Sequence, residues 1–219
     1  MLFEDRKDAG RKLAQALISY RNRDVVVYAL PRGGVVIGAE VARVLDAPLD
    51  LVIARKIGHP SLPECAIAAV TEDGHIVTSP EEELRLDRRW FEQEVRIQQK
   101  EANRRRQVYV QGREPLPVIG RIAIIVDDGV ATALTMFAAI QQLRQRYPAR
   151  IVVAVPVAHP AAVRKLKLLA DEVIALHTPE SFMAVGRYYV QFDQVSDAEV
   201  IDLMSYPELR ELSGPGRRA

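Results

Sequence analysis

Short, uninterrupted apolar runs constrain the fold of this 219-residue chain more than any other feature. The runs are rich in valine and isoleucine, and they cover residues 25–30, 51–54, 122–126, 151–157 and 173–176. A strand with one face in solvent alternates between apolar and polar residues, whereas a strand buried on both faces does not. The runs therefore predict the strands of a parallel sheet that is covered on both sides.

Helical periodicity appears between several of these runs. Residues 37, 41, 44 and 45 share one apolar face, residues 136, 140, 143 and 147 share another, and residues 6–20 predict an N-terminal helix. Strands that alternate with helices predict an α/β fold with a doubly wound, mainly parallel sheet of about five strands. The chain contains no repeat, low-complexity tract or Gly/Ser linker, so we expect a single domain over residues 1–219.

One region breaks the alternation. Residues 66–70 and 75–78 flank Glu72-Asp73-Gly74, which predicts a β-hairpin with a tight turn. A charged helix is predicted from Glu81 to about Gln107, with its apolar side formed by Leu86, Trp90, Phe91 and Ile97. We interpret residues 66–110 as a hairpin-plus-helix insertion over one end of the sheet, either a lid or an element of a homodimer.

Composition narrows the class of protein. The 30 basic and 29 acidic residues nearly cancel, so no net field favours a nucleic acid or a membrane surface. The longest apolar run, residues 151–158, is much shorter than the ~20 residues that span a bilayer. The N-terminus has no apolar stretch of signal-peptide length, and a single cysteine, Cys65, suggests a reducing compartment. We expect a cytoplasmic protein with neither nucleic acid nor membrane as a partner.

The most informative loop follows the run at 122–126 and precedes a helix; it reads Asp127-Asp128-Gly129-Val130-Ala131-Thr132-Ala133-Leu134-Thr135. In open α/β sheets, ligands bind where such loops leave the carboxyl ends of strands. A helix N-terminus has free N–H groups that suit a phosphate, and two carboxylates suit a sugar diol or a hydrated Mg²⁺. The alternative is a helix N-terminus capped by Asp and Thr that needs no ligand.

Two further strand ends carry cationic or glycine-rich groups. Arg32-Gly33-Gly34 follows the run at 25–30; paired glycines expose N–H groups to an anion, although a simple strand-to-helix turn has the same composition. Arg55-Lys56 follows the run at 51–54, and we expect both side chains in the same crevice. Lys56 suits a diphosphate leaving group, and the alternative is a solvated pair of cations.

The segment IAIIVDDGVATALTM resembles the phosphoribosyl pyrophosphate (PRPP) motif of type I phosphoribosyltransferases. The resemblance implies that Asp127 and Asp128 contact the ribose hydroxyls and that residues 129–135 wrap the 5′-phosphate. It also implies that Arg32-Gly33-Gly34 binds pyrophosphate. The family usually has glycine at the position of Ala133 and a small residue at that of Leu134. This departure puts phosphate affinity in question, because glycine permits positive φ and close approach.

A longer stretch, ARKIGHPSLPECAIAAVTEDG, resembles a subgroup of uncharacterised phosphoribosyltransferases predicted from sequence, and the similarity extends over most of the chain. The resemblance implies transfer of ribose 5-phosphate from PRPP to an unidentified acceptor, such as a nucleobase, with release of pyrophosphate. It implies Asp127, Asp128 and Lys56 as catalytic residues, Arg55 among the pyrophosphate ligands, and Mg²⁺ held by the two aspartates through water.

Two alternatives stay open. A module of the same fold that binds PRPP or a nucleotide without turnover is favoured by Ala133 and Leu134, and a metal-dependent phosphate-ester hydrolase would use the same acidic pair.

Aromatic residues near the C-terminus either stack on a flat acceptor or seal an edge of the core: Phe182, Tyr188, Tyr189 and Phe192.

Overall fold

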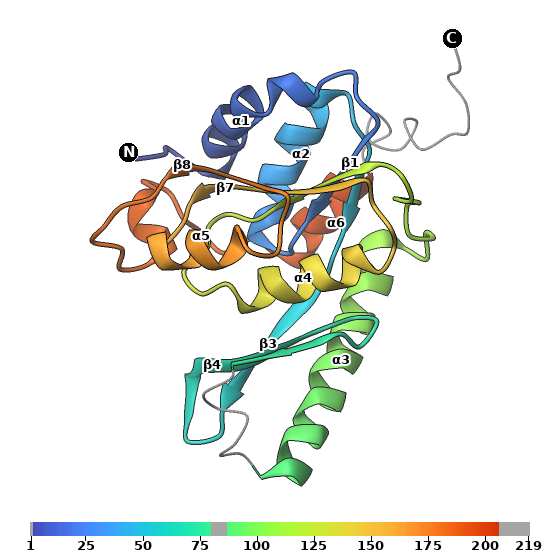
Figure 1. The fold of residues 1–219 in the computed structure, drawn as a ribbon, viewed down its shortest axis with the longest axis vertical. Helices are drawn as coiled ribbons and strands as arrows, with labels where there is room; N and C mark the ends of the chain where they lie inside the picture. The colour runs from blue at the N-terminus through green and yellow to red at the C-terminus, as the bar shows by residue number, and fades with distance from the viewer. Residues whose placement is uncertain (1, 80–86, 206–219) are drawn as a thin grey trace.

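The computed structural model describes residues 2–79 and 87–205. Its centre is a parallel sheet in which the strands lie in the order β2-β1-β6-β7-β8 (Figure 1). The strands are β1 (Val25–Ala29), β2 (Leu49–Leu51), β6 (Ile122–Val126), β7 (Arg150–Val157) and β8 (Glu172–His177). The predicted α/β fold with a five-stranded parallel sheet is confirmed.

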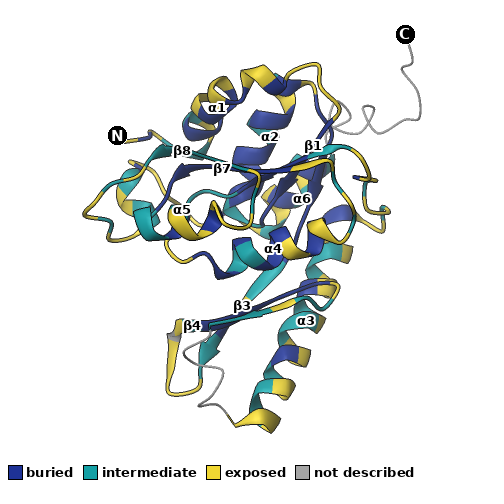
Figure 2. Ribbon diagram, in the orientation of Figure 1, coloured by how far each residue is buried: buried dark blue, intermediate teal, exposed yellow. Residues whose placement is uncertain are grey.

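Both faces of the sheet are covered, as uninterrupted apolar strands require. Successive residues of β1, β6 and β7 enter two different core clusters, one on each face. One face packs against α1 (Arg6–Ala16), α2 (Gly33–Leu45) and α6 (Asp197–Ser205), and the other against α4 (Leu134–Arg144) and α5 (Pro160–Leu166). Strands β1, β2, β6 and β7 are accordingly buried over almost their whole length, whereas β8 at the edge of the sheet is only partly buried (Figure 2).

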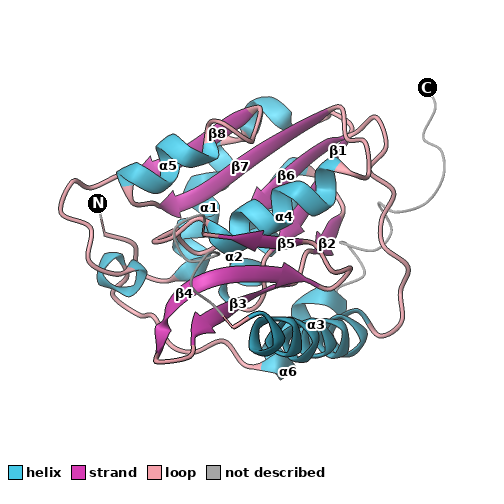
Figure 3. Cartoon of the chain, turned by 60° about the horizontal axis from the view of Figure 1, so that its bottom comes forward, coloured by secondary structure: helices cyan, strands magenta, loops and turns pink. Residues whose placement is uncertain are grey.

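A second, antiparallel sheet projects from this core together with the long helix α3 (Arg88–Val110) (Figures 1 and 3). Its strands are β3 (Ala54–His59), β4 (Leu62–Thr71) and β5 (Ile76–Thr78). The hairpin around Glu72-Asp73-Gly74 is confirmed, because residues 68–70 of β4 pair with residues 76–78 of β5. One side of the small sheet packs on α3 and the other on α4.

Two sequence-based predictions of secondary structure were wrong. The run at 51–54 is not one strand, because β2 ends at Leu51 and β3 begins at Ala54 in the other sheet. We propose that the insertion, predicted over residues 66–110, also includes β3, so that Arg55 and Lys56 belong to it. Apolar residues bridge the two sheets here, so hydrophobicity alone could not show the break. Tyr147, expected on a helix face, is 76% exposed with φ of 55° beyond the end of α4.

The predicted helices at the N-terminus and in the insertion are both observed, with different bounds. The N-terminal helix ends at Ala16 and is followed by a 3₁₀ turn, Ile18–Tyr20, instead of continuing to residue 20. In the insertion, α3 is observed from Arg88, whereas the predicted start at Glu81 lies outside the described residues. None of the described helices combines the length and apolar character that crossing a membrane requires.

A buried polar network joins the insertion to the core. Arg106 of α3 is paired with Asp50 of β2 at 3.0 Å and with Glu72 at 3.5 Å. Glu72 also accepts hydrogen bonds from the Ile53 N–H at 2.8 Å and from Gln142 of α4 at 3.0 Å. Through this network, Arg106 on α3 is connected to β2 and, by way of Glu72, to α4.

Candidate ligand-binding site

Two loops that follow neighbouring strands lie against each other at the carboxyl edge of the parallel sheet. Strands β1 and β6 are paired in parallel with Ala29 opposite Val126, so residues 30–34 and 127–135 leave the sheet side by side. A Cβ on Gly33 would lie 1.9 Å from Oδ2 of Asp128, and one on Gly34 would lie 3.0 Å from Cα of Asp127. Glycine is therefore required at both positions for the two loops to meet.

The first loop starts a helix without a side-chain cap. A cis peptide bond joins Pro31 and Arg32, and α2 begins at Gly33 directly after it. Among the described residues no side chain caps this helix start, so the first N–H groups of α2 have no capping side chain as an acceptor. A helix N-terminus of this kind suits an anion.

The two carboxylates are held at this junction. The Asp128 N–H donates to Oδ1 of Asp127 at 2.8 Å, and the Asp128 side chain is only 17% exposed. Burial raises the pKa of Asp127 well above its usual range, and the neighbouring charge of Asp128 adds to this effect. Burial also raises the pKa of Asp128, against the opposing charge of Arg6. Such a pair favours a bound cation or hydroxyl donors nearby.

Two residues that the sequence did not single out as site residues hold Asp128. The Arg6 Nε donates to Oδ2 of Asp128 at 2.9 Å, and the Tyr189 hydroxyl donates to the backbone carbonyl of Asp128 at 2.6 Å. The two residues come from opposite ends of the chain. They have no motif-like spacing relative to Asp128, so only the fold shows that they belong here.

The loop 129–135 leads into α4, whose start also has no side-chain cap. Ala133 occupies the cap position with φ of −92°, and no described side chain hydrogen-bonds to the first N–H groups. The expected alternative, a helix capped by Asp and Thr, is therefore not observed. Val130 is fixed by its N–H to the Val157 carbonyl at 2.9 Å. Thr132 is exposed, which leaves its hydroxyl accessible to a ligand.

The geometry also explains the two departures from the PRPP motif. No residue from 129 to 135 has a positive φ, so the backbone does not require glycine at Ala133. The Leu134 side chain is 9% exposed and packs against Ala69 of β4 and Ala138 of α4. It therefore points into the contact between α4 and the small sheet.

The adjacent cations of β3 are separated by the pleat of the strand. Lys56 is exposed, and its charge partly offsets the rise that burial causes in the pKa of Asp127 and of Asp128, which places it within electrostatic range of the pair. Arg55 lies on the other side of β3, where its Nε donates to Gln98 of α3 at 2.6 Å. The structure thus brings Lys56 to the loops and does not bring Arg55 there with it.

Arg32 is engaged by an acid at the start of α6. Its Nη1 lies 3.4 Å from Oδ1 of Asp197, and the Tyr109 hydroxyl donates to the same oxygen at 2.7 Å. The hydrogen bond from Tyr109 lowers the pKa of Asp197, and Arg32 adds to this effect. Asp197 and Tyr109 are further residues that no sequence pattern indicated.

The C-terminal aromatic residues divide into two groups. Tyr189 is buried and forms part of the core, as the sealing interpretation predicted. Phe182 and Tyr188 stack on each other at 5.5 Å, with His159 edge-on to Phe182 and His177 edge-on to Tyr188. These four partly buried rings gather beyond the carboxyl ends of β7 and β8. A Cβ on Gly129 would lie 2.6 Å from Val185, which shows how closely this segment covers the loop.

Comparisons with known proteins show the family of the chain. The family model for the phosphoribosyl transferase domain matches residues 3–193. A Mycobacterium tuberculosis H37Rv protein named "Putative phosphoribosyl transferase Rv0571c" is 45% identical over 202 residues, which cover 91% of this chain and 46% of that protein. The chain thus spans about half the length of this curated relative.

Solved structures extend the comparison to the fold. The crystal structure of TT1426 from Thermus thermophilus has a TM-score of 0.80 at 43% identity, and the match covers 98% of this chain and all of that one. The AQ2163 protein of Aquifex aeolicus has a TM-score of 0.50 at 14% identity, over 83% of this chain and 78% of that chain, and shares the fold alone. The chain belongs to the phosphoribosyl transferase domain family.

Proposed function

We propose that the protein binds PRPP at the junction of the two loops and transfers its ribose 5-phosphate group to a small-molecule acceptor, with release of pyrophosphate. The observation that carries the proposal is the close approach of the uncapped start of α2 to the carboxylates of Asp127 and Asp128, in a loop that leads into a second uncapped helix start, that of α4. PRPP presents matching groups: a diphosphate and a monophosphate separated by a ribose diol. The membership of the family supports the same substrate.

Each end of the substrate has a partner in this proposal. Residues 129–135 and the start of α4 bind the 5′-phosphate, and Asp127 and Asp128 accept hydrogen bonds from the ribose hydroxyls. Gly33 and Gly34 supply N–H groups to the diphosphate, with the charges of Arg32 and Lys56 beside them. Arg55 is left out, because its side chain lies on the α3 side of the small sheet.

The chemistry that these residues support is substitution at C1 of the ribose. The bond between C1 and the diphosphate oxygen breaks as the acceptor bonds to C1, so negative charge accumulates on the leaving diphosphate. Lys56, Arg32 and the start of α2 stabilise that charge, and the carboxylates hold the ribose in register for attack. Catalysis on this view consists of positioning and electrostatic stabilisation.

The residues fit a hydrated Mg²⁺. No cluster of three potential metal ligands occurs within the described residues, but Mg²⁺ commonly takes one or two carboxylates and completes its shell with water and substrate phosphates. The carboxylates of Asp127 and Asp128 meet this condition: burial raises the pKa of both groups, and a cation bound beside them would favour their charged forms. When bound, Mg²⁺ would neutralise part of the diphosphate charge.

The stacked pair Phe182 and Tyr188 supports a planar acceptor. The rings are partly exposed and belong to the segment whose Val185 lies against Gly129 in the loop that follows β6. Flat aromatic rings bind flat heterocycles by offset stacking. A nucleobase-like acceptor is therefore the first class to test.

Two measurements test the proposal. Calorimetry with Mg²⁺ should show saturable PRPP binding, and a panel of bases should then release pyrophosphate in an assay of the same protein. The variant carrying both Asp127→Asn and Asp128→Asn should lose binding, whereas Asp202→Asn, which removes one exposed acid from α6, should retain it. Unchanged binding by the double variant would remove the proposed site.

A binding module without turnover is the second candidate. Ala133 and Leu134 suggested it, but the negative φ at Ala133 and the burial of Leu134 remove the steric reason for poor phosphate binding. Binding of PRPP without pyrophosphate release, for every acceptor in the panel, would support the module. Metal-dependent phosphate release from simple esters would instead support a hydrolase.

A further inference from the structure

Arg6 occupies a position that the stability of its own helix does not explain. It is the first residue of α1, directly after the N-cap Asp5. The N-terminus of a helix carries partial positive charge, so a cation there is unfavourable for the helix itself. The Arg6 side chain is nonetheless only 11% exposed, which requires compensating partners elsewhere.

Those partners come from three separate segments. The Nε donates to Oδ2 of Asp128 at 2.9 Å, and Nη1 donates to the backbone carbonyl of Asp193 at 2.7 Å. The guanidinium carbon lies 3.9 Å from the centre of the Phe192 ring. The position that a Cβ of Gly33 would take is 2.8 Å from the same Nε.

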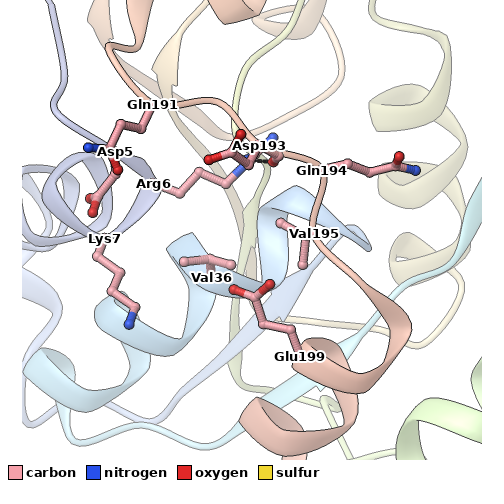
Figure 4. A pocket seen from close by; sticks show the side chains of 9 residues that line it. All are labelled: Asp5, Arg6, Lys7, Val36, Gln191, Asp193, Gln194, Val195 and Glu199. Carbon is pink, nitrogen blue, oxygen red and sulfur yellow. Dashed lines mark hydrogen bonds between the residues drawn. The ribbon is translucent and has the colours of Figure 1, made fainter.

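Figure 4 shows Arg6 extending from α1 toward Asp193 beside a surface hollow of about 170 Å³. The C-terminal segment is fixed to the N-terminus on the same side, because the Phe3 N–H donates to the Tyr188 carbonyl and the Val190 N–H donates to the Phe3 carbonyl. Arg6 therefore connects three segments: the loop at 127–135 (the acidic loop), the loop at 30–34 (the glycine loop) and the segment that carries the aromatic rings.

The contact leaves one carboxylate oxygen for a ligand. Arg6 and Asp128 share a single hydrogen bond through Oδ2, and among the described residues no other side chain hydrogen-bonds to this carboxylate. Building on the proposed function, we propose that Arg6 is a positioning residue that fixes the Asp128 carboxylate so that Oδ1 faces the ribose hydroxyls of PRPP. Its fork makes two directed hydrogen bonds and a stacking contact at once, which lysine cannot reproduce.

A double-mutant cycle separates this role from simple attraction of an anionic substrate. Affinity for PRPP with Mg²⁺ is measured by calorimetry for the wild type, Arg6→Gln, Asp128→Asn and the combined variant. If Arg6 acts through Asp128, Arg6→Gln lowers affinity by about 10- to 100-fold alone. In the Asp128→Asn background it lowers affinity by less than about threefold, because the two changes are coupled.

Controls address charge and folding. Arg11→Gln removes the same charge from an exposed position of α1 and should change affinity by less than about twofold. Arg6→Lys keeps the charge and most of the bulk; it should recover only part of the lost affinity, and it replaces Arg6→Gln in the cycle if that variant fails to fold. Full recovery by lysine would show that charge alone matters and would overturn the inference.

The remaining outcomes are equally distinct. Equal losses from removing Arg6 in the two backgrounds would mean that Arg6 does not work through Asp128, and the inference would fail while the proposed function stands. An effect of Arg6→Gln no larger than that of Arg11→Gln would have the same meaning. A wild-type chain that binds no PRPP would remove the proposed function and the inference together.

Discussion

The parallel sheet and the insertion bury very different kinds of side chain. Strands β1, β6 and β7 are apolar throughout their buried length, and their residues divide between two apolar clusters. The four buried polar or charged residues within the described chain all lie where the insertion meets the core: Asp50, Thr71, Glu72 and Gln142. Apolar packing stabilises the parallel sheet, whereas buried charge pairs fix the position of the insertion relative to it.

The difference has a functional consequence. The insertion carries Lys56, and the proposed site needs this charge in range of Asp127 and Asp128. Apolar contacts alone tolerate sliding and repacking, whereas a guanidinium shared by two acids fixes one geometry. The contacts of Arg106 with Asp50 and Glu72 are thus expected to affect the site as well as the stability of the fold.

The largest effect on the free energy of unfolding is expected from removing Arg106, which connects the insertion to the core. Replacing Arg106 by Met keeps the bulk but leaves the buried acids Asp50 and Glu72 without their cation. Removing one partner of a buried pair typically costs about 3–5 kcal/mol, so the free energy of unfolding in urea should fall by that amount. Burial already raises the pKa of Glu72, which shows that its charge is poorly solvated even with Arg106 present.

A matched change on the same helix provides the control. Arg104 of α3 pairs with Glu101 at the surface, where solvent screens the charges, so its removal should change the free energy of unfolding little. If Arg104→Met and Arg106→Met destabilise the protein equally, the contrast between the sheet and the insertion is wrong.

The apolar part of the joint is expected to have the next largest effect. Leu134 packs between β4 and α4, so Leu134→Ala leaves a cavity and should destabilise the protein by about 2–4 kcal/mol in the same unfolding experiment. Leu168, which is 83% exposed, should tolerate the same replacement within about 0.5 kcal/mol. A small effect at Leu134 would show that the charge network alone holds the insertion.

The two regions also differ in how well the sequence predicted them. Uninterrupted valine and isoleucine runs have one good solution, a sheet buried on both faces, so the α/β fold with its parallel sheet could be predicted. The insertion could not be bounded, because the apolar residues at 51–54 cross from one sheet to the other. Arg55 and Lys56 are adjacent in sequence, but the pleat turns their side chains to opposite sides.

The parts of the site that were missed have a common physical cause. Arg6, Tyr189 and Asp197 contact the loops from segments that are distant in the chain, and Tyr109 contacts Asp197. Each contact is made through a side chain whose direction depends on tertiary packing. A motif records local backbone requirements, such as the glycines at 33 and 34. It does not record long-range partners.

A smaller effect tests whether the charges at the sheet edge serve function at the expense of stability. Because the pKa of Asp127 is raised, the folded state favours its protonated form, and ionisation at neutral pH destabilises the fold. Without ligand and metal, Asp127→Asn should therefore raise the free energy of unfolding by roughly 1 kcal/mol at neutral pH. Asp202→Asn should change it little.

The pH dependence gives the sign of this effect. As pH falls from neutral through the raised pKa of folded Asp127 toward that of an ordinary carboxyl group, the wild type regains the stability that ionisation removed. The advantage of Asp127→Asn should therefore shrink over that range. An advantage that is constant with pH would show that the charge of Asp127 has no part in it.

The smallest effect concerns the contact between the glycine loop and α6. Asp197 lies 3.4 Å from Arg32 and places a negative charge where a diphosphate would approach. Asp197→Asn removes that charge and leaves an amide that can still accept the Tyr109 hydrogen bond, so the fold should persist. Removing one partly exposed charge should raise the affinity for inorganic pyrophosphate with Mg²⁺ about two- to fivefold, and the gain should shrink in high salt because solvent ions screen it.

Glu199→Gln, which removes an exposed acid two residues further along α6, provides the matched control. If Asp197→Asn weakens pyrophosphate binding instead, Asp197 holds Arg32 in its binding position, and the C-terminal helix then belongs to the site as the insertion does.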